Sequence, residues 1–188
     1  DGGDTGGADV QATSGRLVIA SATGVGASNA LETKVDSLEV VNATSGHISI
    51  SDASTDALLV VNAVQQTAGN LQIVSDGTLT VVDNGVAGNA VATVDGTVTL
   101  EAVAAQVNDG IQSVDGNITV TADNNISLSD GTLIDAGSGT ITLSADGDIT
   151  LGRLLTTNDS TAAVRLTSTA GEIVDGGDTG GADVQATS

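Results

Sequence analysis

Short segments with an aliphatic residue at the first and third positions recur along the chain at nearly constant spacing. Successive segments begin 19 to 23 residues apart. The middle position is aliphatic in only two of them, at Val18 and Leu59. This alternation is typical of strands with one buried face. The segments are Leu17–Ile19, Leu38–Val40, Leu58–Val60, Leu79–Val81, Val98–Leu100, Ile118–Val120, Ile141–Leu143 and Val164–Leu166.

Strands that repeat about every 20 residues leave too little chain between them for a crossover helix, which favours a parallel β-solenoid. We therefore expect an all-β, right-handed β-helix with about eight coils in 174 residues. Further strands are expected in each coil, for example at 47–50, 70–73, 125–128 and 148–151. Two alternatives are an array of β-sandwiches and a second alignment with seven coils. The second alignment is anchored on Gly15, Ser37, Gly69, Gly96, Gly116, Gly139 and Gly171.

The first fourteen residues, DGGDTGGADVQATS, return letter for letter at residues 175–188. An exact recurrence of this length predicts a tandem repeat of 174 residues. Residues 1–174 are then one full repeat of a continuous solenoid, and residues 175–188 begin the next identical repeat. We expect the chain to be part of a longer repetitive protein, with adjacent copies of itself as its partners.

The composition limits both the core and the partners. The chain has no Phe, Tyr, Trp, Pro, Cys or Met, so small aliphatic side chains alone must form the core. The net charge of −20 repels phosphate backbones and makes nucleic acid an improbable partner. No apolar run is long enough to cross a bilayer, so we expect no direct membrane insertion.

Acidic residues give the strongest case for a binding site. Asp4 and Asp9 lie in a glycine-rich stretch that is reminiscent of the calcium-binding pattern G-G-x-G-x-D. The strand alignment places Asp123 under Asp146 and Asn125 under Asp148, and stacked carboxylates repel unless a cation lies between them. The candidate calcium ligands are therefore Asp4, Asp9, Asp123, Asp146 and Asp148. The alternative is that these residues form turns and bind backbone groups.

Ice binding and enzymatic activity have less support in the sequence than calcium binding. Two outward-facing columns are expected, one with Thr80, Thr99, Thr119 and Thr142 and a neighbouring one with Thr78, Thr97, Asn117 and Thr140, an arrangement that resembles ice-binding surfaces. Thr is also a favoured strand residue on a solvent-facing surface. The single histidine, His47, is expected on an exposed strand face, and nothing groups it with a catalytic partner. We expect no enzymatic activity and no required cofactor.

The cadence Gly-x-Ile-x-aliphatic at Gly116–Val120 and Gly139–Leu143 resembles the repeat regions of filamentous haemagglutinin-like large exoproteins. That resemblance implies a secreted bacterial surface β-helix that serves as the shaft of an adhesin. The resulting hypothesis is a structural repeat of an extracellular fibre or giant surface adhesin. The alternative is a calcium-binding module of such an adhesin, or one that binds ice or glycan.

Overall fold

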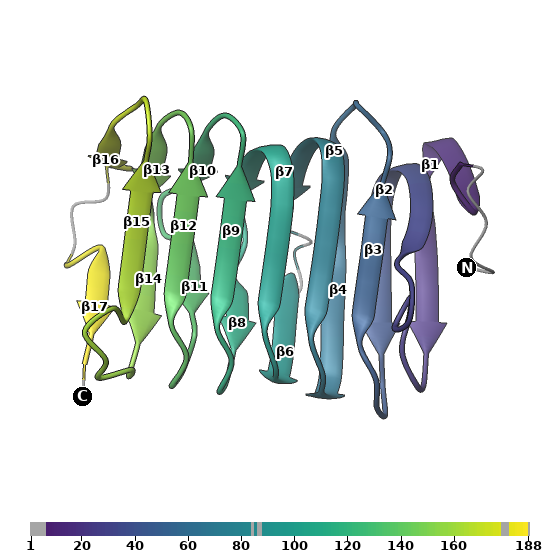
Figure 1. The fold of residues 1–188 in the computed structure, drawn as a ribbon, viewed down its shortest axis with the longest axis horizontal. Coiled ribbons are helices and arrows are strands. Elements are labelled where there is room, and N and C mark those ends of the chain that lie inside the picture. The colour runs from purple at the N-terminus through teal and green to yellow at the C-terminus, as the bar shows by residue number, and fades with distance from the viewer. Residues whose placement is uncertain (1–6, 84, 86–87, 178–180, 188) are drawn as a thin grey trace.

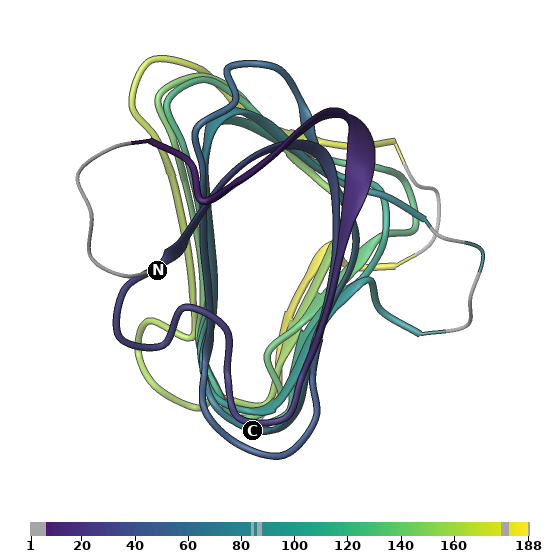
Figure 2. The same ribbon diagram turned by 90° about the vertical axis from the view of Figure 1, so that its right-hand side faces the viewer.

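The computed structural model describes residues 7–83, 85, 88–177 and 181–187. The described chain contains β-strands and no helix, and every strand pairing is parallel. The chain winds around one axis for about seven turns, against the eight coils expected. Seen along the axis, the coils superpose on a three-sided outline (Figure 2). The fold is therefore the predicted parallel β-solenoid.

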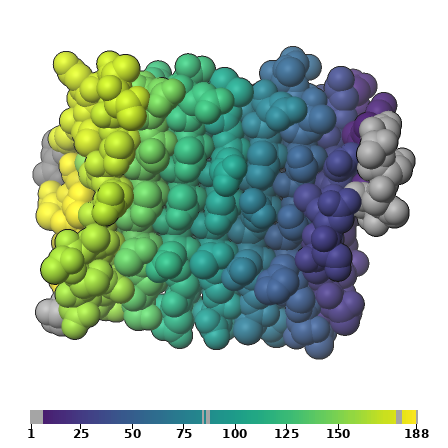
Figure 3. All heavy atoms as spheres, viewed as in Figure 1, coloured from purple at the N-terminus to yellow at the C-terminus, as the bar shows by residue number. Residues whose placement is uncertain are grey.

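The winding is right-handed. In Figure 1 the front strands run upward, and the chain then crosses behind them over the top and descends at the back. Each circuit moves the chain from the N-terminal end on the right toward the C-terminal end on the left (Figure 1). In the space-filling view the coils follow one another as successive bands along the long axis (Figure 3).

The first sheet forms the front face in Figure 1 and holds the best-aligned strands. Its central column runs from Ile48 through Leu71, Val98, Ile118 and Ile141 to Val164. The strands of this sheet are β3 (Ile48–Asp52), the first part of β5 (Leu71–Val81), the first part of β7 (Val98–Val107), β9 (Ile118–Ala122), β12 (Ile141–Ala145) and β15 (Val164–Ser168).

The other two sheets complete each coil. The second sheet contains the ends of β5 and β7, the start of β4 (Leu58–Ala68), β10 (Ile126–Leu128), β13 (Ile149–Leu151) and β16 (Ile173–Asp175). The third contains the rest of β4, β6 (Val91–Asp95), β8 (Ile111–Ser113), β11 (Leu133–Asp135), β14 (Arg153–Thr156) and β17 (Val184–Ala186). The long strands β1 (Val10–Ser21) and β2 (Leu31–Asn42) bend around more than one face.

Stacked aliphatic side chains fill the interior. Ile48, Leu71, Val98, Ile118 and Ile141 are each at most 1% exposed. Each stacks on the equivalent residue of the next coil, so the core is a set of continuous columns and not a central cluster. Stability in such an architecture is the sum of many contacts between neighbouring coils.

Glycine forms the corner between the third and first sheets. A Cβ added at Gly69 would lie 1.9 Å from the carbonyl oxygen of Gly46, and one added at Gly116 would lie 1.8 Å from that of Gly96. Gly139 is in the same situation over Gly116. Neighbouring coils therefore approach so closely here that no side chain fits. Four anchors of the seven-coil alignment, Gly69, Gly96, Gly116 and Gly139, belong to this corner.

Two steps of the predicted alignment differ from the observed register. Leu79 pairs with Ala105 in the second sheet, whereas Val98 pairs with Leu71 in the first. The chain between Leu79 and Val98 therefore passes from the second sheet to the first and completes less than a full turn. Leu38 pairs with Val60, not with Leu58, next to an irregularity in the register.

The predicted threonine columns are corrected by the same register. Thr99, Thr119 and Thr142 do form one outward column on the first sheet. Thr80 pairs with Gln106 and Thr78 with Ala104 on another part of β7, so neither belongs to the columns assigned from the sequence. Thr80 is also buried.

Candidate functional site

Polar side chains line one inner corner of the solenoid. We call Asn42, Gln65, Thr93, Ser113 and Thr156 the polar spine, and each is at most 2% exposed. Asn42, Gln65, Thr93 and Ser113 occupy the same column in four successive coils. The aliphatic pattern alone does not reveal the spine, but the period-2 rule does, because each spine residue follows a buried aliphatic residue by two positions and so lies on the same inward face.

The polar spine binds the backbone at the glycine corner. The hydroxyl of Thr93 donates to the carbonyl of Gly69 at 3.0 Å, and that of Ser113 donates to the carbonyl of Gly96 at 2.9 Å. The Thr156 hydroxyl donates to the carbonyl of Gly139 at 2.6 Å. Each hydroxyl satisfies a carbonyl that the turn would otherwise leave unpaired inside the protein. The spine is therefore structural.

A second set of side chains connects adjacent coils on the outside. The backbone N–H of Asn70 donates to Nδ1 of His47 at 2.9 Å, and the N–H of Thr140 donates to Oδ1 of Asn117 at 2.9 Å. The N–H of Asp148 likewise donates to Oδ1 of Asn125 at 2.8 Å. His47 is thus a backbone acceptor at a corner.

The proposed calcium ligands lie in different places. Asp4 lies outside the described residues. Asp9 is exposed, and its Oδ2 accepts from the backbone N–H of Glu32 at 3.2 Å. The Asp9 carboxylate therefore already has a backbone partner.

The other three candidates are exposed on adjacent coils. Asp123 and Asp146 are stacked as expected, since each directly follows one of the paired residues Ala122 and Ala145. Oδ1 of Asp146 accepts from the Thr169 hydroxyl, and Oδ1 of Asp148 accepts from the N–H of Glu172, both at 2.9 Å. Within the described ranges, no group of three or more His, Asp or Glu side chains is arranged to hold a metal ion.

Asp52 is the carboxylate with the most unusual environment. It is 1% exposed, and Oδ1 accepts from the Thr33 hydroxyl at 2.8 Å and the Val35 N–H at 3.0 Å. Burial raises the pKa of Asp52 above its ordinary value, although these hydrogen bonds and one from the N–H of Ser54 act in the opposite direction. The sequence reasoning did not select Asp52, because it looks like any other turn aspartate.

Asp109 has one buried oxygen without a partner. Its Oδ1 accepts from the N–H of Gly110 at 2.6 Å, but Oδ2 is inaccessible to solvent and accepts no hydrogen bond. Asn89, Asn108 and Asp130 line the same shallow depression of about 280 Å³. Unsatisfied buried oxygens are rare and call for an explanation.

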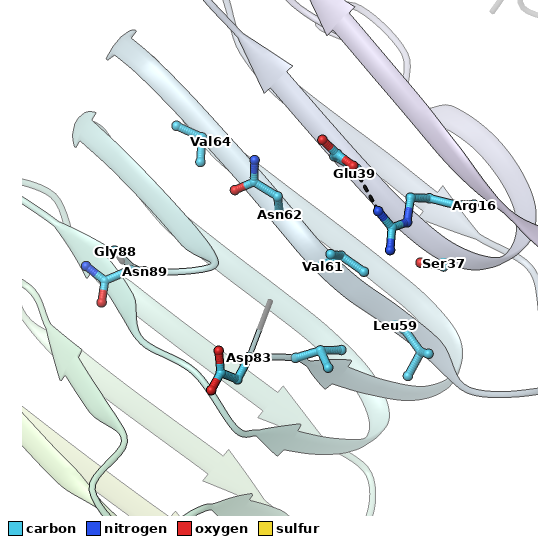
Figure 4. A pocket seen from close by; sticks show the side chains of 11 residues that line it. Arg16, Ser37, Glu39, Leu59, Val61, Asn62, Val64, Asp83, Gly88 and Asn89 are labelled. Atoms are coloured by element: carbon cyan, nitrogen blue, oxygen red, sulfur yellow. Dashed lines mark hydrogen bonds and ion pairs between the residues drawn. The ribbon is translucent and has the colours of Figure 1, made fainter. Parts of the chain in front are cut away.

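A groove with a volume of about 640 Å³ lies over the second and third sheets. Figure 4 shows Leu59, Val61 and Asn62 in a row along β4, with the ion pair between Arg16 and Glu39 on one side of this row and Asp83 on the other. The ion pair measures 3.2 Å, and both side chains are partly exposed. An open groove with one solvated ion pair offers no enclosed, low-dielectric environment of the kind that tunes catalytic groups.

The two ends of the stack differ from its middle. Leu17 and Ile19 of β1 are only partly buried, whereas their partners in the next coil, Leu38 and Val40, are 0% exposed. At the opposite end Ile173 is 44% exposed and Val184 38%. Aliphatic columns therefore continue to both end faces and are incompletely covered there.

Comparison with known proteins gave no match to a family model, a curated protein or a solved structure. In the part of the chain that the structure describes, no helix has the length and apolar character of a membrane span. Any functional assignment therefore depends on the coil stack itself.

Proposed function

We propose that the chain is a structural repeat of an extracellular fibre or giant surface adhesin, and that identical repeats stack end to end into a long rod. The observation that carries this proposal is the exposure of core columns at both end faces. Leu17 and Ile19 at one end and Ile173 at the other continue columns that are fully covered within the stack. Burial of these side chains against a further copy would be favourable.

The chemistry along the sides agrees with a mechanical role. Most of the polar groups described above bind the backbone of the same or the next coil, as Ser113 and Asn117 do. Continuous ladders of this kind leave few segments that unfold locally and expose the chain to proteases. The rod would supply reach and stiffness, while the extracellular location rests on the resemblance to large exoproteins.

Small-angle X-ray scattering on chains with one and two copies of the repeat tests the rod. Seven turns at about 4.8 Å per strand spacing predict an increase in maximum dimension of about 34 Å per copy. The cross-sectional radius should stay constant. A two-copy chain that thickens without lengthening contradicts the proposal.

Calcium binding is the second candidate, and the observation that favours it is the buried, unpartnered Oδ2 of Asp109, a residue that lines a depression together with Asn89, Asn108 and Asp130. Calcium binds carboxylate, amide and carbonyl oxygens. The test is thermal unfolding with calcium and with excess chelator. A ligand that binds only the folded state raises Tm, so an unchanged Tm removes this candidate.

A further inference from the structure

The repeated fourteen-residue segment occupies two different places in the same structure. Its described strand-forming part is Val-Gln-Ala, at residues 10–12 in the first copy and 184–186 in the second. In the first copy Val10 pairs with Thr33 of β2. In the second copy the identical Val184 pairs with Leu154 of β14. We call these three residues the docking strand, and the two edges the β2 seat and the β14 seat.

The two seats belong to different faces of the solenoid. Thr33 pairs with Asp52, which pairs with Ser75, so the β2 seat continues a column at the end of the first sheet. Leu154 pairs with Ile134, which pairs with Ile111, so the β14 seat lies on the third sheet. One sequence is therefore compatible with two distinct edges.

Both seats cover core residues. In the β2 seat, Val10 and Ala12 cover Thr33 and Val35, which are 0% and 1% exposed. In the β14 seat, Val184 and Ala186 cover Leu154 and Thr156, which are both 0% exposed. Backbone hydrogen bonds hold the β14 seat at each end, from the N–H of Leu154 to Asp183 and from the N–H of Thr187 to Thr156.

The two placements exclude each other in a continuous array. Ile19 follows Val10 by nine residues and stacks in the column that leads through Val40 and Ala63 to Leu154 and Val184. In a tandem array the equivalent of Ile19 would follow Val184 by the same nine residues. Val184 and this equivalent of Ile19 would then need the same column. The shortest return to one column among the described pairings, from Thr33 to Asp52, takes 19 residues. One seat must be vacated at every junction.

We infer that the docking strand is exchangeable and that its partner is the β14 edge of another copy of this chain. In the array, Val10 of one copy docks over Leu154 of the copy before it, Gln11 over Leu155 and Ala12 over Thr156. The β2 seat is then empty, and the stack of the following copy begins at Arg16. This inference rests on the proposed end-to-end stacking, and it makes each junction a discontinuity in the winding of the coils along the rod.

Disulfide trapping in the 188-residue chain tests the exchange, and the absence of native cysteine leaves no background. The variant Gln11→Cys/Leu155→Cys joins the docking strand to the β14 seat through positions that face outward. Adding Thr187→Pro weakens the chain's own β17 in that seat, because it removes the N–H that donates to the carbonyl of Thr156. We expect interchain disulfides whose yield rises with protein concentration, and a lower yield when Thr187 is retained.

Two controls define the outcome. Leu155→Cys/Gln185→Cys should close within one chain, since these residues are paired in the structure. Adding Thr13→Pro to the test variant removes the N–H equivalent to that of Thr187 and should sharply lower the yield of the interchain product. An undiminished yield with Thr13→Pro, or complete absence of the product from folded test variants both with and without Thr187→Pro, overturns the inference.

The scattering experiment separates this inference from the proposed function. If the two-copy chain is elongated but the interchain disulfide never forms, the rod is supported and the strand exchange is contradicted. If the interchain disulfide forms but the two-copy chain is not elongated, the strand exchange is supported and the rod is contradicted.

Discussion

The side-chain amide of Asn42 donates a 2.8 Å hydrogen bond to Oε1 of Gln65, in the next coil, inside the core. The same amide donates to the carbonyl of Ser45, and Oδ1 of Asn42 accepts from the N–H of Gly24. Two buried side chains thus connect the turns of neighbouring coils directly. The polar spine therefore fixes the vertical register at the corner where the coils approach most closely.

Replacement of Gln65 by leucine should lower the free energy of unfolding by about 1–3 kcal/mol, because the change leaves a buried amide donor of Asn42 unsatisfied. The matched control is Gln106→Leu, at an exposed strand position, which should change stability by no more than about 0.5 kcal/mol. Urea unfolding of both variants measures the difference. Equal effects would show that the spine hydrogen bonds do not stabilise the fold.

Much of the fold follows from the sequence, because period-2 alternation of small aliphatic residues can be recognised locally. The pairings of Val98 with Ile118 and of Ile118 with Ile141 follow directly from it. The step from Leu79 to Val98 does not, because all three faces use the same aliphatic pattern. Only the lengths of the turns decide which face a segment joins, and these lengths vary.

The candidate site could be predicted less well. The stacking of Asp123 and Asp146 was predicted, since it depends only on strand register. The hydrogen bond from the N–H of Glu172 to Asp148 was not, because strand register alone does not show which backbone N–H a turn side chain faces. The burial of Asp52 also escapes the sequence pattern, because the aliphatic alternation that predicts a strand at 47–50 ends before it, whereas β3 continues the inward face from Ile50 to Asp52.

The glycine corner should be intolerant of any side chain. Gly116→Ala places a Cβ 1.8 Å from the carbonyl oxygen of Gly96, so we expect a loss of at least about 2 kcal/mol from overpacking. Gly15→Ala is the control, because its Cβ would meet only the Cβ of Ala12, at 3.8 Å. Thermal unfolding followed by circular dichroism compares the two. A normal Tm for Gly116→Ala would contradict the close approach of the coils.

Asp52 should make stability depend on pH. Because burial raises its pKa in the folded protein, the folded state holds this proton more tightly than the unfolded state does. Its contribution to stability is fully present below the ordinary carboxyl pKa of 3.8 and is lost as the pH rises through the folded-state pKa. Urea unfolding across this range should show wild type losing stability relative to Asp52→Asn. A constant difference between the two proteins would contradict a raised pKa.

Two substitutions of Asp148 distinguish a role in backbone hydrogen bonding from a role in calcium binding. Asp148→Asn keeps the oxygen that accepts from the N–H of Glu172, so capping alone predicts little change in Tm with or without calcium. Asp148→Ala removes that acceptor and should cost about 0.5–1.5 kcal/mol. If Asp148→Asn abolished a calcium-dependent rise in Tm, the carboxylate charge, and not the hydrogen bond, would be its role.

Ile118 offers the most direct test of the columns. It is 0% exposed and pairs with Val98 on one side and Ile141 on the other. Ile118→Asp buries an unpaired charge against both neighbours, so we expect a loss of more than about 4 kcal/mol, among the largest that single substitutions cause. Thr119→Asp, one residue along and facing outward, is the matched control and should stay folded. Hydrogen exchange should show lost protection in the coils on either side of Ile118, because each coil is held by its neighbours. A folded Ile118→Asp protein with unchanged protection would mean that the register of the first sheet is wrong.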